Sequence, residues 1–174
     1  MRTLTVKKGG GGSWKDGWNS LTISNAAYGE YNGSKYLDIW FDGLPESLNM
    51  RVYEAKNSEG EEFAIGQIFR FANAGIMEGL EGPDGNTVIK FSDNEDNLKA
   101  CTLNVYIYKD GKYSRVCIQP APTTFDNAAD SFSEDDVKFW KDKAEAYFQK
   151  YVVPKLKNED PVEEMSFEEL GSAL

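Results

Sequence analysis

Two stretches of the chain alternate apolar and polar residues without a break, and this alternation constrains the fold more than any other feature. They span Ser34–Phe41 and Leu48–Ala55. In the first stretch Leu37, Ile39 and Phe41 share one parity, so a β-strand places them on one face. A helix would scatter these side chains around its axis. The alternation therefore predicts two strands of a sheet that turns one face toward a core.

Weaker signals complete the N-terminal half of the chain. Leu21–Ile23 has the composition of a short strand, and the segment 25–33 is predicted to be rich in turns. Over residues 63–76 the apolar spacing changes to that of a short buried helix. The glycine-rich stretch 78–86 predicts a loop, and Thr87–Phe91 predicts a short strand.

The C-terminal half predicts a hairpin and a longer helix. Leu103–Tyr108 and Lys112–Ile118 flank an Asp-Gly dipeptide, which is typical of a tight β-turn. Ser133 has the place of a helix N-cap, and Asp136 stands where a capping box has its acidic residue. The helix is expected to run to about Val152 or Leu156. Its apolar stripe contains Val137, Trp140, Ala144, Tyr147, Phe148 and Tyr151.

The predicted order is strand, strand, strand, helix, strand, strand and an added C-terminal helix. This order favours a mainly β fold, a five-stranded barrel of the oligonucleotide/oligosaccharide-binding (OB) type with a short helix between strands 3 and 4. A small sandwich or another half-open barrel gives a similar order. The predicted organisation is a flexible basic arm (1–13), the barrel (14–125), a helix packed on or near it (126–157) and a disordered acidic tail (158–174).

Catalytic chemistry has little support in the residues. The chain has no histidine, no phosphate-binding glycine motif and no nucleophile motif, so we predict that it is not an enzyme and needs no cofactor or metal. Asp93, Glu95 and Asp96 resemble a solvated loop more than a Mg²⁺ site. Cys101 and Cys117 are expected to be small buried residues of a protein kept in the reducing cytoplasm. The sequence shows neither a signal peptide nor a membrane-spanning apolar run.

The predicted outer face of the sheet carries aromatic and basic side chains where Thr, Ser, Lys and Glu are usual. The predicted inward residues are Leu37, Ile39 and Phe41 together with Leu48, Met50, Val52, Leu103, Val105, Ile107, Val116 and Ile118. Their neighbours along each strand must then point outward. Bases of single-stranded DNA stack on such rings, and cations neutralise its phosphates. The predicted nucleic-acid-binding residues are Tyr36, Trp40, Arg51, Tyr53, Tyr106, Tyr108, Tyr113, Arg115, Lys35 and Lys112.

A structural interpretation of the same face stays open. Outward aromatic residues also pair across strands, or are covered by another element. The apolar stripe of the C-terminal helix must dock somewhere, and it either covers part of this face or forms a homodimer contact. In a second functional interpretation the chain is an adaptor that uses the face for a protein partner.

Charge divides the chain into unlike parts. The formal net charge is −10, and residues 159–169 contain six acids and no Lys or Arg, so residues 1–158 carry −4. An acidic chain of this kind needs a local basic patch to bind nucleic acid. An inhibitor that imitates DNA would instead need acids spread over the folded surface. The concentration of acids at one end predicts a solvated interaction segment.

Three stretches, NAAYGEYNGSKYLDIWFDG, EEFAIGQIFRFANAGI and SEDDVKFWKDKAEAYF, resemble small bacteriophage-encoded proteins, and the chain is similar to a phage single-stranded DNA-binding protein. The resemblance covers most of residues 1–157. It implies an OB fold, sequence-independent binding and a role in DNA replication, recombination or repair in the infected cell. It also implies a tail that recruits replication proteins and competes with DNA, here through Glu163, Glu164, Phe167, Glu168 and Glu169. The chain departs from that pattern because residues 171–174 follow, with no terminal Phe.

Overall fold

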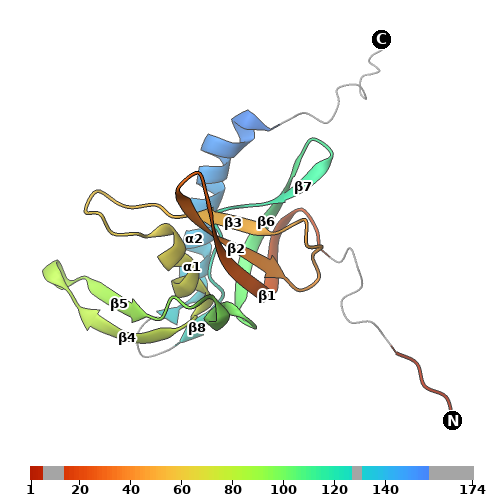
Figure 1. Cartoon of the computed structure of the whole chain (residues 1–174), viewed down its shortest axis with the longest axis horizontal. Coiled ribbons are helices and arrows are strands. Elements are labelled where there is room, and N and C mark those ends of the chain that lie inside the picture. Colours follow the sequence, from red (N-terminus) through yellow and green to blue (C-terminus); the bar gives the residue numbers. More distant parts are fainter. Residues whose placement is uncertain (6–13, 127–130, 157–174) are drawn as a thin grey trace.

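A five-stranded antiparallel sheet with the strand order β3-β2-β1-β6-β7 is the centre of the computed structural model, which describes residues 1–5, 14–126 and 131–156 (Figure 1). Helix α1 (Ala64–Ala72) follows the third strand, and α2 (Glu134–Tyr147) follows the last. With 40% strand and 27% helix the protein is mainly β, as predicted. The strands of the sheet are β1 (Gly17–Tyr31), β2 (Ser34–Phe41), β3 (Met50–Tyr53), β6 (Thr102–Asp110) and β7 (Tyr113–Val116).

Two small hairpins lie outside this sheet. Strands β4 (Ile76–Glu81) and β5 (Thr87–Phe91) form one that projects from the body (Figure 1), and β8 (Phe125–Asp126) pairs with β9 (Ser131–Phe132). The prediction of a loop over 78–86 is wrong in its first half, because β4 extends to Glu81. The described residues also contain four short helical turns: η1 (Pro83–Gly85), η2 (Glu95–Leu98), η3 (Phe148–Val152) and η4 (Val153–Lys155).

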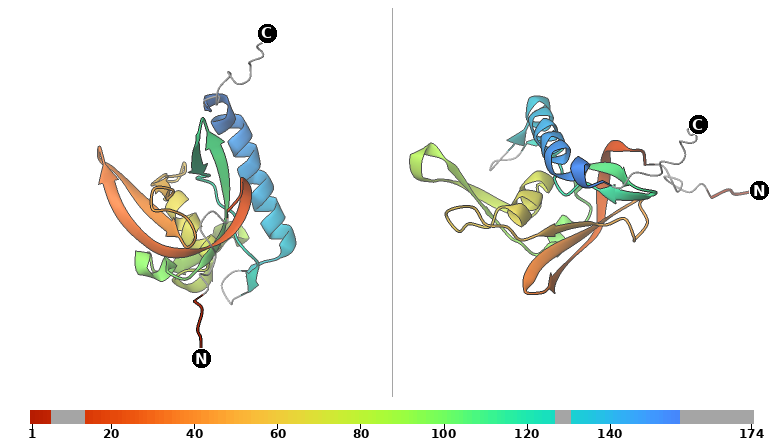
Figure 2. Two further views of the ribbon diagram at one scale, coloured as in Figure 1. Left: turned by 90° about the vertical axis from the view of Figure 1, so that its right-hand side faces the viewer. Right: turned by 90° about the horizontal axis from the view of Figure 1, so that it is seen from above.

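Strand β1 is much longer than the predicted Leu21–Ile23. The prediction of turns over 25–33 is wrong, because the chain stays extended to Tyr31 and only Asn32 and Gly33 make the turn. Their φ angles of 52° and 81° are those of a type I′ hairpin. The first half of β1 pairs with β6 and the second half with β2, with an irregularity after Ile23. This long curved strand joins the two halves of the sheet (Figure 2).

The core lies where the alternation placed it. All nine predicted inward residues from Leu37 to Ile107 are buried, and so is Val116. Helix α1 covers this face with Ile65, Ile68 and Phe69. Ile118 is the exception, because it is 47% exposed. Strand β7 ends at Val116, so the parity of a strand no longer applies to Ile118.

Helix α2 begins as the sequence predicts. The Ser133 Oγ accepts a hydrogen bond from the Asp136 amide at 3.2 Å, and the Ser133 amide donates to the Asp136 carboxylate at 2.9 Å. This is a complete capping box. The helix docks through its apolar stripe: the Trp140 ring meets Phe71 at 5.0 Å, and Phe148 is buried. The chain continues through η3 and η4 to Lys155, close to the predicted end.

The described strands form an open sheet, since β3 and β7 are its edges and no pairing closes it into a barrel. Within the described residues no helix is long and apolar enough to cross a membrane. Most of the predicted basic arm lies outside the described residues. The whole predicted acidic tail, with Glu163, Glu164, Phe167, Glu168 and Glu169, lies outside them too.

Candidate nucleic-acid interface

The outer face of β2 and β3 carries a stacked group of side chains that we call the platform: Tyr36, Arg51 and Tyr53. The strand register places Tyr36 opposite Tyr53. Their rings meet edge to face with centroids 5.6 Å apart. The Arg51 guanidinium carbon lies 3.8 Å from the centre of the Tyr36 ring. Arg51 and Tyr53 are exposed, so a guanidinium plane and a phenol ring form the surface of this face.

Gly29 explains why Tyr36 lies flat. The register sets Gly29 beside Tyr36, and a Cβ at Gly29 would lie about 2.4 Å from the Tyr36 ring. A glycine leaves room for the ring to lie across strand β1, and a Cβ at this position would force the ring to shift. One face of Tyr36 therefore rests on β1 and the other is covered by Arg51. Bases cannot reach the Tyr36 ring directly, so the exposed stacking surfaces are those of Arg51 and Tyr53.

Asp38 holds Arg51 in place. The Arg51 Nε donates to Asp38 Oδ1 at 2.7 Å, and a terminal guanidinium nitrogen donates to Oδ2 at 2.9 Å. This paired geometry fixes the guanidinium plane. The hydrogen bonds that Arg51 donates to Asp38 raise the pKa of Arg51, with a smaller contribution from a hydrogen bond with Tyr53. Because Asp38 neutralises the charge, Arg51 offers a flat stacking surface more than a free cation for phosphate.

Helix α2 covers two of the predicted binding residues. Phe148 lies 5.0 Å from the Tyr106 ring and 4.9 Å from the Tyr108 ring. Trp18 meets Tyr106 at 5.4 Å and donates its indole N–H to Glu145 of α2 at 2.7 Å. Burial raises the pKa of both tyrosine hydroxyls. Tyr106 and Tyr108 are therefore half-buried, because the C-terminal helical segment docks on β6 through Phe148, as the structural interpretation of this face allowed.

The remaining predicted residues lie on two separate parts of the sheet, β2 and the β6–β7 hairpin. Tyr113 is 58% exposed on β7, with Lys112 and Arg115 at 5.5 Å and 5.9 Å from its ring centre. Lys35 is exposed at the start of β2, beside the platform, and Trp40 is half-buried near the end of the same strand. The structure brings Tyr36, Arg51 and Tyr53 together, and it places the Tyr113 group on the opposite edge strand.

Sequence reasoning missed two residues that shape the platform, Gly29 and Asp38. Asp38 has the same parity as Tyr36 and Trp40, so it lies on the outer face of its strand. Once the two strands are paired, this position predicts Asp38 as a partner of Arg51. Gly29 gave no signal, because its role depends on a register between β1 and β2 that the predicted turn over 25–33 did not contain.

In the described residues no cluster of three His, Cys, Asp or Glu side chains is placed to hold a metal ion. Asp96 lies within η2, where its amide donates to the capping Asn94 side chain at 2.9 Å, and its carboxylate lies 3.5 Å from the Lys99 ammonium. Cys117 is buried, as predicted, and Cys101 is half-buried.

The burial of Cys117, directly after strand β7, can be tested through the reactivity of its thiol. Burial raises the pKa of its thiol from an ordinary value near 9 to about 11. Because the pKa of this thiol is higher in the folded than in the unfolded chain, the thiol contributes to the free energy of unfolding below pH 9. This contribution is lost as the pH rises through 11. We expect native protein at pH 8 to react with a thiol reagent at Cys101 well before Cys117, with both reacting at once in urea. Equal native rates would contradict the burial, and Cys101→Ser assigns the faster phase.

A comparison of the chain with protein-family models, with curated proteins and with solved structures gave no significant match.

Proposed function

We propose that this protein binds single-stranded DNA without sequence preference and serves DNA replication, recombination or repair in a phage-infected cell. The observation that carries the proposal is the platform, in which Asp38 and Gly29 hold a guanidinium plane and a phenol ring flat on an open sheet face. Stacking on such planes suits every base, since each has a π-face, and it requires bases that are not already paired in a duplex.

The strand order supports an OB-like ancestry for the sheet. A long first strand pairs with the second and fourth strands of the main sheet, and α1 follows the third. OB folds use the face of strands 2 and 3 for oligonucleotides, and here that face carries the platform. The β4–β5 hairpin is then an insertion between the helix and the fourth strand.

Titration with oligo-dT tests the proposal directly. We expect binding to a fluorescent 30-mer at low salt, with log Kd rising linearly with log salt as phosphate contacts release counterions. A duplex of the same length should bind at least tenfold more weakly. Absence of binding at low salt, both for the full chain and for a chain that ends at residue 158, would overturn the proposal.

Removal of the acidic tail is expected to tighten binding. Six acids lie within 159–169, and Leu156, close before them, lies at the end of the described fold. A tethered polyanion competes with DNA phosphates for the same cations. Deletion of residues 159–174 should lower the Kd for oligo-dT about tenfold at 50 mM salt, and the difference should shrink as salt screens the tail. An unchanged Kd at 50 mM salt would exclude competition, and replacing the six acids by Gln or Asn separates charge from length.

The β4–β5 hairpin favours a second candidate function, that of an adaptor for a protein partner. It exposes Met77, Leu80 and Val88 to 64%, 45% and 44%. An isolated two-stranded hairpin is marginal in water and gains from a partner. Replacing Leu80 and Val88 by Asp should then abolish capture of that partner without altering oligo-dT binding, and loss of both activities would contradict a separate adaptor surface.

A further inference from the structure

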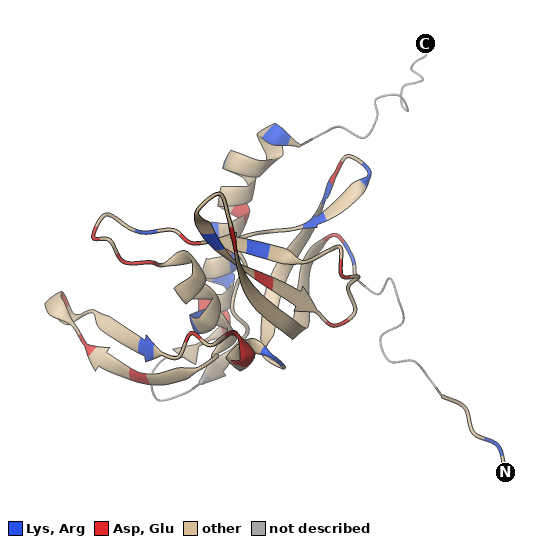
Figure 3. Ribbon diagram, in the orientation of Figure 1, with Lys and Arg blue, Asp and Glu red and all other residues tan. Residues whose placement is uncertain are grey.

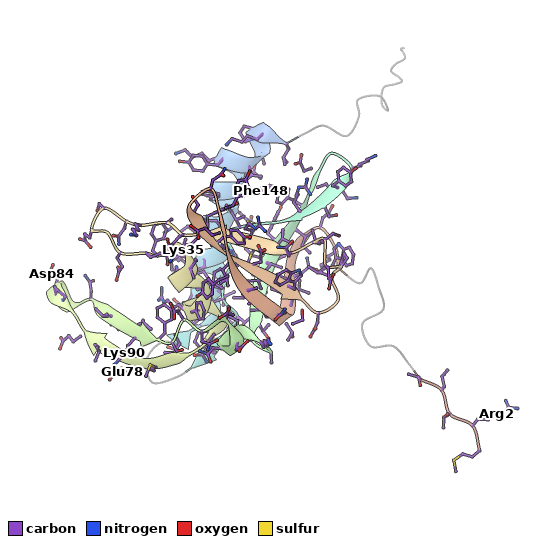
Figure 4. The ribbon with its side chains drawn as sticks, in the orientation of Figure 1. Arg2, Lys35, Glu78, Asp84, Lys90 and Phe148 are labelled. Atoms are coloured by element: carbon purple, nitrogen blue, oxygen red, sulfur yellow. The ribbon has the colours of Figure 1, made fainter. Side chains whose placement is uncertain are left out.

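An open groove lies between the β6–β7 hairpin and the C-terminal end of α2. The hairpin forms one edge of the sheet, and the platform lies at the opposite edge. The volume of the groove is about 510 Å³, and its walls include Tyr108, Asp110 and Ile118 on one side and Tyr147, Tyr151 and Lys155 on the other. Phe148 anchors the helix next to this groove, on Tyr108 (Figure 4). At Phe148 the helix changes to a π-turn, η3, which is a form that occurs often at functional sites.

Aromatic and apolar side chains in the groove remain open to solvent. The rings of Tyr147 and Tyr151 lie 4.9 Å apart at 48°, and Tyr151 is 48% exposed. Ile118, which parity placed in the core, opens instead into this groove at 47% exposure. An apolar side chain at this level of exposure next to two tyrosines makes a surface that suits a flat, partly apolar ligand.

Positive charge gathers around the same groove. Residues 108–118 and 147–156 together contain five Lys or Arg and one acid, so they carry a net charge of +4 in a chain of −10. The acid, Asp110, lines the groove with Lys155 and lies 3.9 Å from Arg115, so the excess positive charge is on the rims of the groove. By comparison, residues 34–41 and 50–56 around the platform carry three basic and two acidic residues. Figure 3 shows basic residues on the β6–β7 hairpin and at the end of α2. Lys150 also lies over Tyr151, with its Nζ 5.2 Å from the ring centre.

We propose that this groove is a second nucleotide-binding surface, which takes bases on Tyr147 and Tyr151 and phosphates on Lys150 and Lys155. The inference rests on the proposed binding of single-stranded DNA and adds a site to it. The platform offers stacking planes with Arg51 neutralised by Asp38, and the groove offers rings with Asp110 beside Arg115 and with Lys150 and Lys155 outside that pair. A single strand gains most of its phosphate contacts at the groove, where the charge is, and additional stacking at the platform. Tyr113, with Lys112 and Arg115, lies on the hairpin beside the groove and continues this surface.

Charge neutralisation at the groove gives the first test. We compare Lys150→Gln/Lys155→Gln with Lys90→Gln/Lys99→Gln, a pair with the same charge change on β5 and after η2 (Lys90 is labelled in Figure 4). Two lost phosphate contacts should lower the salt slope for oligo-dT by about 1.4 and weaken binding about 20-fold at 0.1 M salt. The control pair should change the Kd less than twofold. Equal effects of the two double variants would overturn the assignment. Tighter binding of oligo-dT by the groove variant would also overturn it, and would indicate that the acidic tail occupies the groove.

Photocrosslinking of the full chain to an oligonucleotide that contains 5-iodo-deoxyuridine gives the second test. We expect crosslinked peptides that contain Tyr147 or Tyr151, identified by mass spectrometry, besides those of the platform. Crosslinks to Tyr53 alone would overturn the groove and leave the proposed function standing. An oligonucleotide that neither binds nor crosslinks would overturn both. Tyr151→Phe should keep its crosslink and its affinity, and Tyr151→Ala should lose both while the thermal midpoint changes little, because the side chain is half exposed.

Discussion

Replacing Phe148 by alanine should lower the free energy of unfolding by about 3 kcal/mol, the largest stability effect that we expect from one substitution in α2 or in the turn η3 that continues it. The Phe148 side chain is 6% exposed and contacts the rings of Tyr106 and Tyr108. Removing a buried phenyl ring loses its transfer free energy and leaves a cavity. The loss corresponds to a fall in the thermal midpoint of about 6–12 °C for a chain of this length, measured by circular dichroism.

Phe139→Ala is the matched control on the same helix. Its ring is 58% exposed and contacts the neighbouring Trp140, so its loss should cost less than about 1 kcal/mol. If α2 did not dock on β6, the two substitutions would have equal effects. In the Phe148→Ala protein Tyr106 and Tyr108 become accessible, so the binding of a hydrophobic dye should increase. If stability falls but the dye signal does not change, the helix stays docked and the substitution has only created a cavity beneath it.

The sequence predicted those elements whose signals are local. Alternation located β2 with its observed bounds, the Asp-Gly dipeptide located the β6–β7 hairpin, and Ser133 with Asp136 located the start of α2. The second half of β1 was missed because Ala26, Ala27 and Gly29 have weak strand propensity. That segment is extended because β2 pairs with it along its length, and such pairing is a property of the assembled sheet.

The candidate site divides in the same way. Parity alone predicted that Tyr36, Arg51 and Tyr53 share one face, and the structure confirms this. Parity also predicted Tyr106 and Tyr108 on an outer face, yet it carries no information on what covers that face. The docking of α2 through Phe148 decides it, and that contact joins residues about 40 positions apart. The platform was predictable as a set of residues, but its stacking order was not.

That stacking order leads to the largest expected effect on binding. Tyr53→Ala should weaken oligo-dT binding by about 5- to 150-fold, the range for the loss of one base stack. Arg51→Lys tests the guanidinium more sharply than Arg51→Ala does. Lysine keeps the positive charge but loses the plane and the paired hydrogen bonds to Asp38. We expect Arg51→Lys to weaken binding nearly as much as Tyr53→Ala, with little change in the salt slope.

The salt slope distinguishes the two roles that an arginine can play at this position. If Arg51 binds phosphate, Arg51→Lys keeps most of the affinity, and Arg51→Met lowers the salt slope by about 0.7. If it acts as a stacking plane, both variants lose affinity at an almost constant slope. Arg51→Met alone also leaves the Asp38 carboxylate, 8% exposed, without its partner, so Asp38→Asn/Arg51→Met is the proper background for this measurement. Phe139→Ala, which should not affect binding, is the reference. If the double variant binds oligo-dT with full affinity, the platform is not part of the binding site, and the groove beside Phe148 is where the strand binds.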